Sequence, residues 1–461
     1  MTLIKSISGI RGTIGGNPGD GLTPIDIVNF SAAFGRLIQK KLSKEKIKIV
    51  LGRDARISGE FVENLVSNTL VGMGAEIISL GLATTPTVEI AVQLEKADGG
   101  IILTASHNPG HWNALKLLNE KGEFFSAKDG EELLRIIEEK DFSFAEIDNL
   151  GSLIRNVTYN QEHIELIKNL ELVNTDLIKA ANFKVAIDCV NSVGGIIIPT
   201  LLKELGVSEI VELYTEPSGI FPHNPEPVPE NLSEISSKVK ETKADVGFVV
   251  DPDVDRLAIV SEDGSMFGEE YTLVAISDYV LSKTPGNTCS NLSSTRALKD
   301  ISEKYGVNYF SAAVGEVNVV ESMKKNDCII GGEGNGGVIY PALHYGRDAL
   351  VGIALFLTHL AESKLNCSEL RAKYPNYVIS KNKISLDKGM NIDQLLSNIK
   401  NRYSTHKTNE IDGLKIEFEE GWVHLRKSNT EPIIRIYAEH RTQQGAEDLA
   451  EEIIQSIKQI M

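Results

Sequence analysis

Short apolar runs alternate with amphipathic helical patterns over about the first 375 of the 461 residues. Such alternation favours parallel sheets with helices on both faces. Strands are expected at residues 47–51, 77–80, 100–104, 184–188, 209–213, 247–250, 257–260 and 328–330. The clearest helix is expected after Thr23, a good N-cap residue, with Pro24 in its first turn. Its apolar face contains Ile27, Phe30, Phe34, Leu37 and Ile38.

The last 85 or so residues have a different pattern. Strands are expected at 383–386, 414–418, 422–425 and 433–437, the last three in quick succession. A closing helix is expected from Gly445, with Ala446, Leu449 and Ile453 on its apolar stripe. This part of the sequence predicts an α+β unit with an antiparallel sheet. At about 150 residues per domain, the whole length suggests three domains.

The charge balance limits the partners of the chain. With 47 Lys and Arg against 64 Asp and Glu, the net charge is −17. We therefore expect no nucleic-acid partner, which would need a basic face, and no binding to an anionic membrane. The longest apolar stretch, about 349–357, is shorter than the roughly 18 residues of a membrane span. The N-terminal residues have no signal-peptide pattern, and four widely spaced cysteines fit free thiols, so a cytoplasmic location is expected.

Residues 104–109, Thr-Ala-Ser-His-Asn-Pro, follow an expected strand. Ser106 stands in a turn beside His107, and Lys116 follows ten residues later, where its cation could reach a bound phosphate. A serine becomes a nucleophile only when a base or a metal activates it. The segment alone is therefore compatible with a nucleophile or with an ordinary serine turn, and it is not the Gly-x-Ser-x-Gly elbow of esterases.

Residues 251–256, Asp-Pro-Asp-Val-Asp-Arg, carry the strongest chemical signal. Asp251, Asp253 and Asp255 alternate, so an extended chain would aim all three carboxylates to one side. Converging carboxylates are costly without a cation, and oxygen ligands suit Mg²⁺ or Ca²⁺. An EF-hand is excluded because Arg256 stands where that loop needs glycine and the flanking segments have strand patterns. The alternative is a solvated acidic turn.

Two further loops could bind a ligand. Residues 331–337 contain five glycines, and Glu333 and Asn335 could bond sugar hydroxyls; a flexible loop without a ligand is the alternative. Residues 426–432 combine an arginine, hydroxyls and an amide, which suit a phosphate, although an ordinary β-turn fits equally well. The candidate phosphate-binding residues are Arg426, Ser428, Asn429, Thr430 and Arg435.

Together and in this order, these segments resemble the α-D-phosphohexomutase superfamily, which contains phosphoglucomutases, phosphomannomutases and phosphoglucosamine mutases. The resemblance also includes Ser-Gly-Ile-Arg-Gly at 8–12 and Gly-Arg-Asp-Ala-Arg at 52–56, and it spans nearly the whole chain. Gly-Glu-Gly-Asn-Gly-Gly at 332–337 and Ser-Asn-Thr-Glu-Pro at 428–432 look most like the archaeal-type phosphoglucosamine mutase branch.

The resemblance implies four domains around a central cleft. Residues 1–155, 156–256 and 257–374 would be three related α/β domains with mixed sheets, carrying the phosphoserine, metal and sugar loops. Residues 375–461 would be a smaller α+β lid with the phosphate loop. Four domains then replace the three that the length suggests.

The resemblance also implies a role for each candidate residue. Ser106 would be the phosphoserine, and its oxygen would bind one Mg²⁺ together with the three aspartates. Catalytic groups that stabilise the phosphoryl group or move protons would be Arg11, His107 and Lys116. Substrate would be bound by Arg256, by Glu333 and Asn335 at the sugar, and by the five residues of the phosphate cradle. Gly337 stands where many members have a histidine, which leaves the general acid unassigned, and no positional argument supports His344.

The implied function is interconversion of a hexosamine 6-phosphate and its 1-phosphate through a 1,6-bisphosphate, which would also act as an activator. A phosphoglucomutase or phosphomannomutase of the same fold is the nearest alternative. A non-catalytic sugar-phosphate sensor is disfavoured because Ser106, Lys116 and all three aspartates are present. A phosphatase is a third alternative. The expected partner is a phosphorylated hexose or hexosamine, and the expected assembly is a monomer or homodimer.

Overall fold

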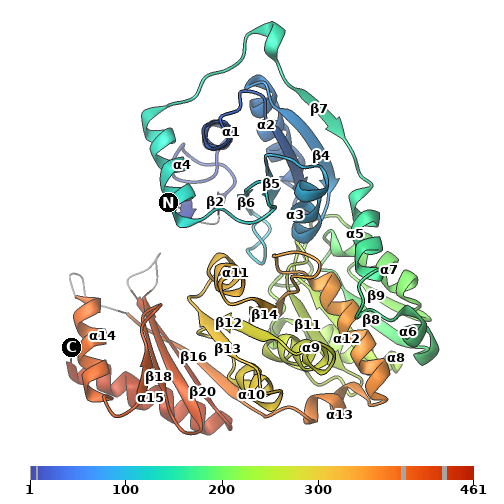
Figure 1. The fold of residues 1–461 in the computed structure, drawn as a ribbon, viewed down its shortest axis with the longest axis vertical. Helices are drawn as coiled ribbons and strands as arrows, with labels where there is room; N and C mark the ends of the chain where they lie inside the picture. The colour runs from blue at the N-terminus through green and yellow to red at the C-terminus, as the bar shows by residue number, and fades with distance from the viewer. Residues whose placement is uncertain (1, 7–8, 386–390, 428–432, 461) are drawn as a thin grey trace. The chain divides into compact units, whose positions relative to one another are not determined.

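The computed structural model describes residues 2–6, 9–385, 391–427 and 433–460. The chain divides into two compact units (Figure 1). Unit 1 contains Met1–Thr272 and Gly336–Glu369, and unit 2 contains Leu273–Asn335 and Leu370–Met461.

Unit 1 begins with a seven-stranded mixed sheet of order β1-β2-β6-β5-β3-β4-β7. Its strands are β1 (Ile4–Ser6), β2 (Gly9–Thr13), β3 (Lys48–Arg53), β4 (Glu76–Leu82), β5 (Gly99–Leu103), β6 (Trp112–Leu118) and β7 (Ser152–Arg155). Strands β3, β4, β5 and β7 are parallel, whereas β6 is antiparallel to both β2 and β5.

Helices cover both faces of this sheet (Figure 1). Helices α1 (Pro24–Leu42), α2 (Gly59–Gly72) and α4 (Ala127–Glu139) pack on the face that contains Ile49 and Ile101. Helix α3 (Thr85–Leu94) packs on the other face, beside Val50 and Ile102. The predicted cap of α1 is confirmed, because Thr23 accepts a hydrogen bond from the backbone of Asp26 in a capping box.

The second sheet of unit 1 has the order β11-β10-β8-β9. Its strands are β8 (Lys184–Asp188), β9 (Glu209–Leu213), β10 (Val246–Val250) and β11 (Leu257–Ser261). Helix α8 (Ser233–Thr242) packs on one face, and α7 (Gly194–Leu205) follows β8. Strand β15 (Gly337–Ile339) leads to α12 (Ala349–Ser363), which is buried along nearly its whole length and contacts α5 (Tyr159–Lys168) and α6 (Thr175–Ala181).

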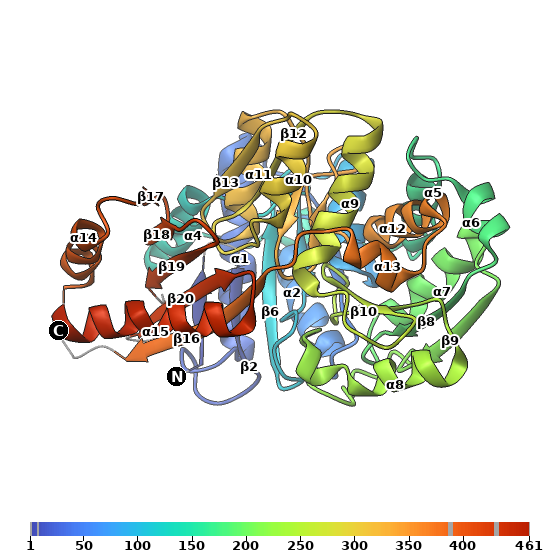
Figure 2. The ribbon, with the colours of Figure 1, turned by 90° about the horizontal axis from the view of Figure 1, so that it is seen from below.

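Unit 2 contains parallel strands in the order β13-β12-β14, followed in the chain by an antiparallel five-stranded sheet of order β16-β20-β19-β18-β17. The strands are β12 (Asn287–Asn291), β13 (Tyr309–Ala312), β14 (Cys328–Glu333), β16 (Val378–Ser385), β17 (Lys407–Asn409), β18 (Leu414–Glu417), β19 (Gly421–Lys427) and β20 (Ile433–His440). Helices α14 (Ile392–Arg402) and α15 (Gln443–Ile460) bury the apolar face of the antiparallel sheet, and Figure 2 shows α15 running along it.

The four sheets confirm the predicted α/β fold with a C-terminal α+β domain. The mixed sheets that the resemblance implies are confirmed, because β6 and β11 turn back after loops too short for a crossover helix; the local pattern alone had favoured wholly parallel sheets. The closing helix begins before Gly445, because Thr442 already accepts the backbone hydrogen bond of Ala446. Residue 386 of an expected strand lies outside the described residues, and the residue borders of the four domains stay predictions.

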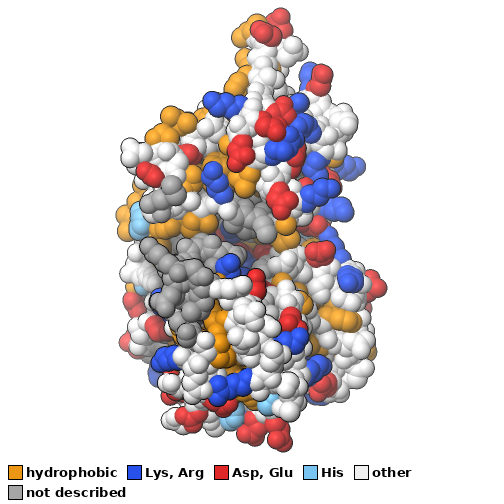
Figure 3. Space-filling view, turned by 90° about the vertical axis from the view of Figure 1, so that its left-hand side faces the viewer, with side chains coloured by type: hydrophobic (Ala, Val, Ile, Leu, Met, Phe, Trp, Pro, Cys, Tyr) orange, Lys and Arg blue, Asp and Glu red, His pale blue; other side chains and the backbone are white. Residues whose placement is uncertain are grey.

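No helix among the described residues has both the length and the apolarity that a membrane crossing requires. On the face drawn in Figure 3, basic and acidic side chains are intermixed.

Candidate active site

Ser106 lies in the loop between β5 and β6 in a backbone conformation that side chains rarely adopt. Its φ is +47°, in the left-handed region, and its side chain is 9% exposed. Its backbone N–H donates to Thr104 Oγ1 at 3.0 Å, and Thr104 Oγ1 donates to Asp54 Oδ2 at 2.6 Å. The Ser106 hydroxyl donates to Asp251 Oδ2 at 2.7 Å. The loop is therefore held so that the hydroxyl points at the first aspartate of the 251–256 segment.

The buried side chain of Arg56 holds this loop through hydrogen bonds to its backbone. Its guanidinium donates to the carbonyls of Pro109 and Asn108, both at 2.7 Å, and also to those of Ser106 and Trp112. Asp54 neutralises the charge of the buried Arg56, whose Nε lies 3.0 Å from Asp54 Oδ2. A single planar cation thus fixes four carbonyls of the turn that presents Ser106.

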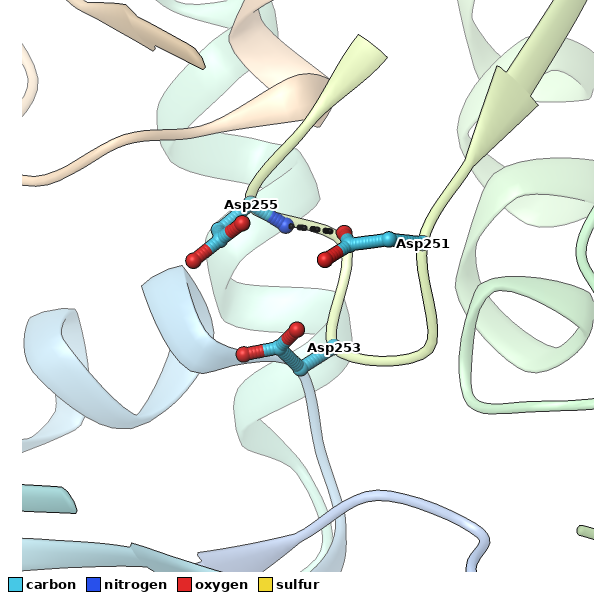
Figure 4. Close-up of side chains that lie close together, drawn as sticks. All are labelled: Asp251, Asp253 and Asp255. Carbon is cyan, nitrogen blue, oxygen red and sulfur yellow. Dashed lines mark hydrogen bonds between the residues drawn. The ribbon is translucent and has the colours of Figure 1, made fainter. Parts of the chain in front are cut away.

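The aspartate loop connects the antiparallel strands β10 and β11 (Figure 4). Asp251, Asp253 and Asp255 are completely buried, and one carboxylate oxygen from each lies within 4.8 Å of the others. The predicted convergence is found, but the predicted extended chain is wrong. Val254 has φ +63°, and Asp251 Oδ1 accepts the backbone N–H of Asp255 at 3.2 Å, so a tight turn gathers the side chains. The flanking strands exclude an EF-hand, as predicted.

Two cations face the three carboxylates. Lys116 Nζ lies 2.6 Å from Asp253 Oδ2 and 3.4 Å from Asp255 Oδ2, and Arg347 Nη2 lies 2.6 Å from Asp255 Oδ2. Burial disfavours the charged form of Lys116, but the two aspartates outweigh it and raise its pKa. Burial also opposes ionisation of Asp253, but Lys116 lowers its pKa. Burial and the neighbouring aspartates raise the pKa of Asp251.

The donor set fits a divalent metal ion. Asp253 Oδ1 and Asp255 Oδ1 are buried and accept no hydrogen bond from the described residues. A metal would use these oxygens, and its charge would remove the cost that raises the pKa of Asp251. Three carboxylates with oxygen-only ligation suit Mg²⁺ and leave positions for further oxygens. Ser106 Oγ, already bonded to Asp251, lies close to this cluster.

His107 is part of the same region of unit 1. Its Nδ1 lies 3.3 Å from Ser106 Oγ, and its Nε2 lies 4.0 Å from Glu226 Oε1. Burial, followed by the positive charge of Arg256, lowers the pKa of His107 to about 3. The ring is therefore neutral at physiological pH, with a hydrogen on one ring nitrogen while the other can accept a hydrogen bond.

Arg11 and Arg256 complete the predicted set in unit 1. Arg256 Nη1 lies 3.6 Å from Glu226 Oε1, and its Nε lies 3.9 Å from Asp255 Oδ1. Arg11 stands two residues after Gly9, which pairs with Lys116 across β2 and β6, so Arg11 and Lys116 lie on one face of the sheet. Its charge also contributes to the lowered pKa of His107.

Unit 2 holds the predicted sugar and phosphate residues. Glu333, at the end of β14, accepts Asn291 Nδ2 at 2.8 Å and the backbone N–H of Gly315 at 3.1 Å, and Asn335 follows it half-buried. These hydrogen bonds orient the Glu333 carboxylate.

Arg426 and Arg435 stand directly opposite each other on β19 and β20. Arg426 Nε lies 2.9 Å from Asp412 Oδ2, and Asp412 also accepts the backbone N–H of Val314. Like charges opposite each other destabilise a sheet, and an anion between them removes that cost. Ser428, Asn429 and Thr430, the rest of the predicted cradle, lie outside the described residues.

Several site residues were not singled out by the sequence. Arg347 is the clearest, since its contact with Asp255 joins segments 92 residues apart. Thr85 Oγ1 donates to Asp253 Oδ2 at 2.6 Å across 168 residues. Of these three residues, only Arg56 could have been found from the sequence, because it belongs to the Gly-Arg-Asp-Ala-Arg segment.

Family models match the chain from end to end. Phosphoglucomutase/phosphomannomutase alpha/beta/alpha domains I, II and III match residues 3–144, 161–264 and 268–377, and the C-terminal domain matches 381–456. The chain belongs to the phosphoglucomutase/phosphomannomutase family. It is therefore a phosphosugar mutase, an enzyme of the isomerase class.

Individual members of this family agree with the assignment. A phosphoglucomutase/phosphomannomutase of Thermococcus kodakarensis is 33% identical, covering 95% of this chain and 96% of the relative. A "probable phosphoglucosamine mutase" of Pyrococcus abyssi is 34% identical, covering 89% of this chain and 90% of the relative. The crystal structure of a phosphoglucomutase/phosphomannomutase family protein from Burkholderia thailandensis has a TM-score of 0.85 at 25% identity, covering 99% of this chain and 97% of that one.

Proposed function

We propose that this phosphohexomutase interconverts glucosamine 6-phosphate and glucosamine 1-phosphate through a phosphoserine at Ser106. The observation that carries the proposal is the hydrogen bond from Ser106 Oγ to Asp251, inside a buried group of three carboxylates faced by Lys116 and Arg347. Phosphoryl transfer depends mainly on positioning and on charge neutralisation, and this arrangement supplies both.

In the proposed reaction, the bond between phosphorus and Ser106 Oγ breaks as a sugar hydroxyl forms a new bond to phosphorus, giving a 1,6-bisphosphate. The sugar hydroxyl loses its proton, and Ser106 Oγ takes up a proton as it leaves. The other phosphate then returns to Ser106 with the opposite proton movements. Because the raised pKa of Lys116 keeps it charged, Lys116 acts as an electrostatic stabiliser. His107 Nδ1 lies 3.3 Å from Ser106 Oγ, within reach of the proton that this oxygen gains and loses, so we propose His107 for that transfer.

The three aspartates and Ser106 would hold one Mg²⁺, which would neutralise charge on the transferring phosphoryl group when bound. Arg11 and Arg256 would add positive charge beside it. A sugar 1,6-bisphosphate would act as the activator that phosphorylates Ser106.

The proposed substrate contacts include residues of unit 2. Glu333 and Asn335 would bond the sugar, and the phosphate that does not react would be bound by Arg426, Ser428, Asn429, Thr430 and Arg435. The pairing of Arg426 with Arg435 across neighbouring strands supports this role, since two adjacent cations suit a phosphate.

The choice of glucosamine is supported by the name of the Pyrococcus abyssi relative, a probable phosphoglucosamine mutase. A glucose or mannose phosphate is the second candidate, because the Thermococcus kodakarensis relative, almost equally similar, is named for those sugars. Comparing kcat/KM for glucosamine, glucose and mannose 6-phosphates tests the choice. A higher value for glucose or mannose would replace the glucosamine assignment.

The nucleophile assignment is tested by Ser106→Ala. Removing the nucleophile should reduce mutase turnover by roughly 10⁴-fold or more even with a bisphosphate primer present. Ser237→Ala, at an exposed position of α8, is the matched control and should leave turnover unchanged. Normal turnover of the Ser106 variant would refute the assignment. Sustained release of inorganic phosphate by the wild type, without isomerisation, would instead indicate a phosphatase.

A further inference from the structure

A chain of buried polar side chains lies behind the aspartate loop in unit 1. Glu89 of α3 faces His344, with Oε2 and Nδ1 3.3 Å apart. His344 Nε2 lies 3.3 Å from Asp348 Oδ2, and the same oxygen lies 2.9 Å from His163 Nε2 of α5. His163 Nδ1 lies 3.0 Å from Thr87 Oγ1, again on α3. The chain therefore begins and ends on α3 and passes through the start of α12.

His344 is the central member of this chain. Its Nδ1 lies within ion-pairing distance of Glu89 and its Nε2 within hydrogen-bonding distance of Asp348, so both carboxylates favour the imidazolium form. Burial opposes its charge, but Asp348 and Glu89 raise its pKa to about 10. His344 is 3% exposed, and both of its ring nitrogens face carboxylates. It therefore does not take the place of the histidine that many family members have at the position of Gly337.

The segment fixed by this chain also contacts the aspartate loop. Arg347 donates to Asp255 Oδ2 at 2.6 Å, and the backbone N–H of Ala349 donates to the carbonyl of Val254 at 3.2 Å. Asp348, between them, caps α12 by accepting the backbone N–H of Leu350 at 2.8 Å. Arg347 is therefore followed directly by two anchored residues.

The opposite side of the aspartate loop contacts α3. Thr85 donates to Asp253 through both its hydroxyl, at 2.6 Å, and its backbone N–H, at 2.9 Å. Gly346 packs so closely on α3 that a Cβ there would lie 1.8 Å from Glu89 Oε2. The buried chain thus joins the two segments that hold the aspartate loop.

We propose that the Glu89–His344–Asp348–His163 chain is a positioning device that fixes Arg347 against Asp255. His344 is then a positioning residue that acts through Arg347. Arg347 contributes positive charge beside the transferring phosphoryl group. This part of the inference rests on the proposed function. Because transfer is sensitive to displacements of about 1 Å, loosening Arg347 slows it.

A double-mutant cycle tests this inference, using His344→Gln, Arg347→Gln and the double variant. His344→Gln should lower kcat roughly 10- to 100-fold, with the sugar-phosphate KM changed less than about threefold. In the Arg347→Gln background, the same change should have almost no further effect on kcat. An equal loss in both backgrounds would overturn the proposal, as would a normal kcat in either single variant. His359→Gln, at a half-buried position of α12, is the control and should change kcat less than about twofold.

Binding of Mn²⁺, followed by electron paramagnetic resonance on the full chain without sugar, gives a readout independent of turnover. Arg347 competes with a cation for Asp255, so releasing it should strengthen Mn²⁺ binding a few-fold in His344→Gln but not further in the double variant. A merely structural defect would weaken Mn²⁺ binding, which would overturn the proposal. If His344→Gln does not fold, Glu89→Gln replaces it in the same cycle with the same expectations. Failure of the proposed function would instead be seen as absence of mutase turnover in the wild type.

Discussion

The candidate residues of unit 1 and those of unit 2 are held in different ways. In unit 1, Ser106 and the three aspartates are buried, and the carboxylates face Lys116 and Arg347 within hydrogen-bonding distance. In unit 2, the two arginines of β19 and β20 face each other, and Arg435 is exposed. The first group is compensated by cations within hydrogen-bonding distance, whereas the second places the exposed Arg435 opposite Arg426, which pairs with Asp412. This difference supports the proposal that the residues of unit 1 carry out turnover and those of unit 2 bind phosphate.

Among the variants that compare the two units, Asp253→Asn is expected to lose the most kcat. The change removes a charge that pairs with Lys116 and would bind the metal, so kcat should fall about 10³-fold. Steady-state kinetics over a Mg²⁺ titration measure it, and the exposed Asp263→Asn is the control. An unchanged Mg²⁺ dependence would remove Asp253 from the metal site.

A smaller loss is expected from Arg56→Lys. Lysine keeps the charge beside Asp54 but cannot hold four carbonyls, so Ser106 loses its fixed presentation. The kcat should fall about 10²-fold while the sugar-phosphate KM stays nearly constant. Arg53→Lys, which changes an arginine paired with Glu63, should leave kcat within a few-fold. A rise in KM without a fall in kcat would show that Arg56 does not act through the serine loop.

Arg426→Gln should have the opposite signature. Loss of a charge-assisted bond of about 1.5–3 kcal/mol should raise the sugar-phosphate KM about 10- to 100-fold, with kcat changed only a few-fold. Arg402→Gln, an exposed arginine at the end of α14, is the control. If Arg426→Gln lowered kcat and left KM unchanged, the proposed roles of turnover for unit 1 and phosphate binding for unit 2 would be wrong.

A prediction that does not involve turnover concerns acid stability. The pKa of His107 in the folded protein, about 3, lies below its unfolded value near 6.5, so the unfolded state takes up the proton first as pH falls. The contribution of neutral His107 is therefore fully present above pH 6.5 and is lost toward pH 3, at most about 1.4 kcal/mol per pH unit. Urea unfolding at several pH values measures how steeply the free energy of unfolding falls with decreasing pH. This pH dependence should be weaker in His107→Asn than in the wild type.

The same measurement on His424 compares the two units. Burial lowers the pKa of His424 in unit 2 to about 4, so His424→Asn should also reduce the slope, over a narrower pH range. A slope unchanged by His107→Asn would show that this histidine is not held neutral.

Much of the fold could be predicted because it depends on local pattern. The cap at Thr23 and strands such as β8 follow from short segments, and their predicted places agree with the structure. The path of the aspartate loop could not be predicted, because a positive φ at a β-branched residue such as Val254 is contrary to local preference. Tertiary contacts over-determine that conformation, including the bond from Ala349 to the Val254 carbonyl.

The candidate site was predicted where its residues lie within short motifs. Ser106, Lys116 and the aspartates were found in this way, and the structure brings them together. Arg347 and His344 were not, because their contacts join distant segments and no short motif encodes them. Ser428, Asn429 and Thr430 lie outside the described residues, so their roles stay predictions.

The most direct test of the central claim is a single turnover of the phosphorylated enzyme. Protein carrying one phosphoryl group is mixed with glucosamine 6-phosphate, and intact mass, the peptide containing Ser106 and the sugar products are followed together. The account predicts that Ser106 loses its phosphoryl group as an equal amount of glucosamine 1,6-bisphosphate forms. Phosphate found on another residue, or released as inorganic phosphate in place of the bisphosphate, would contradict it.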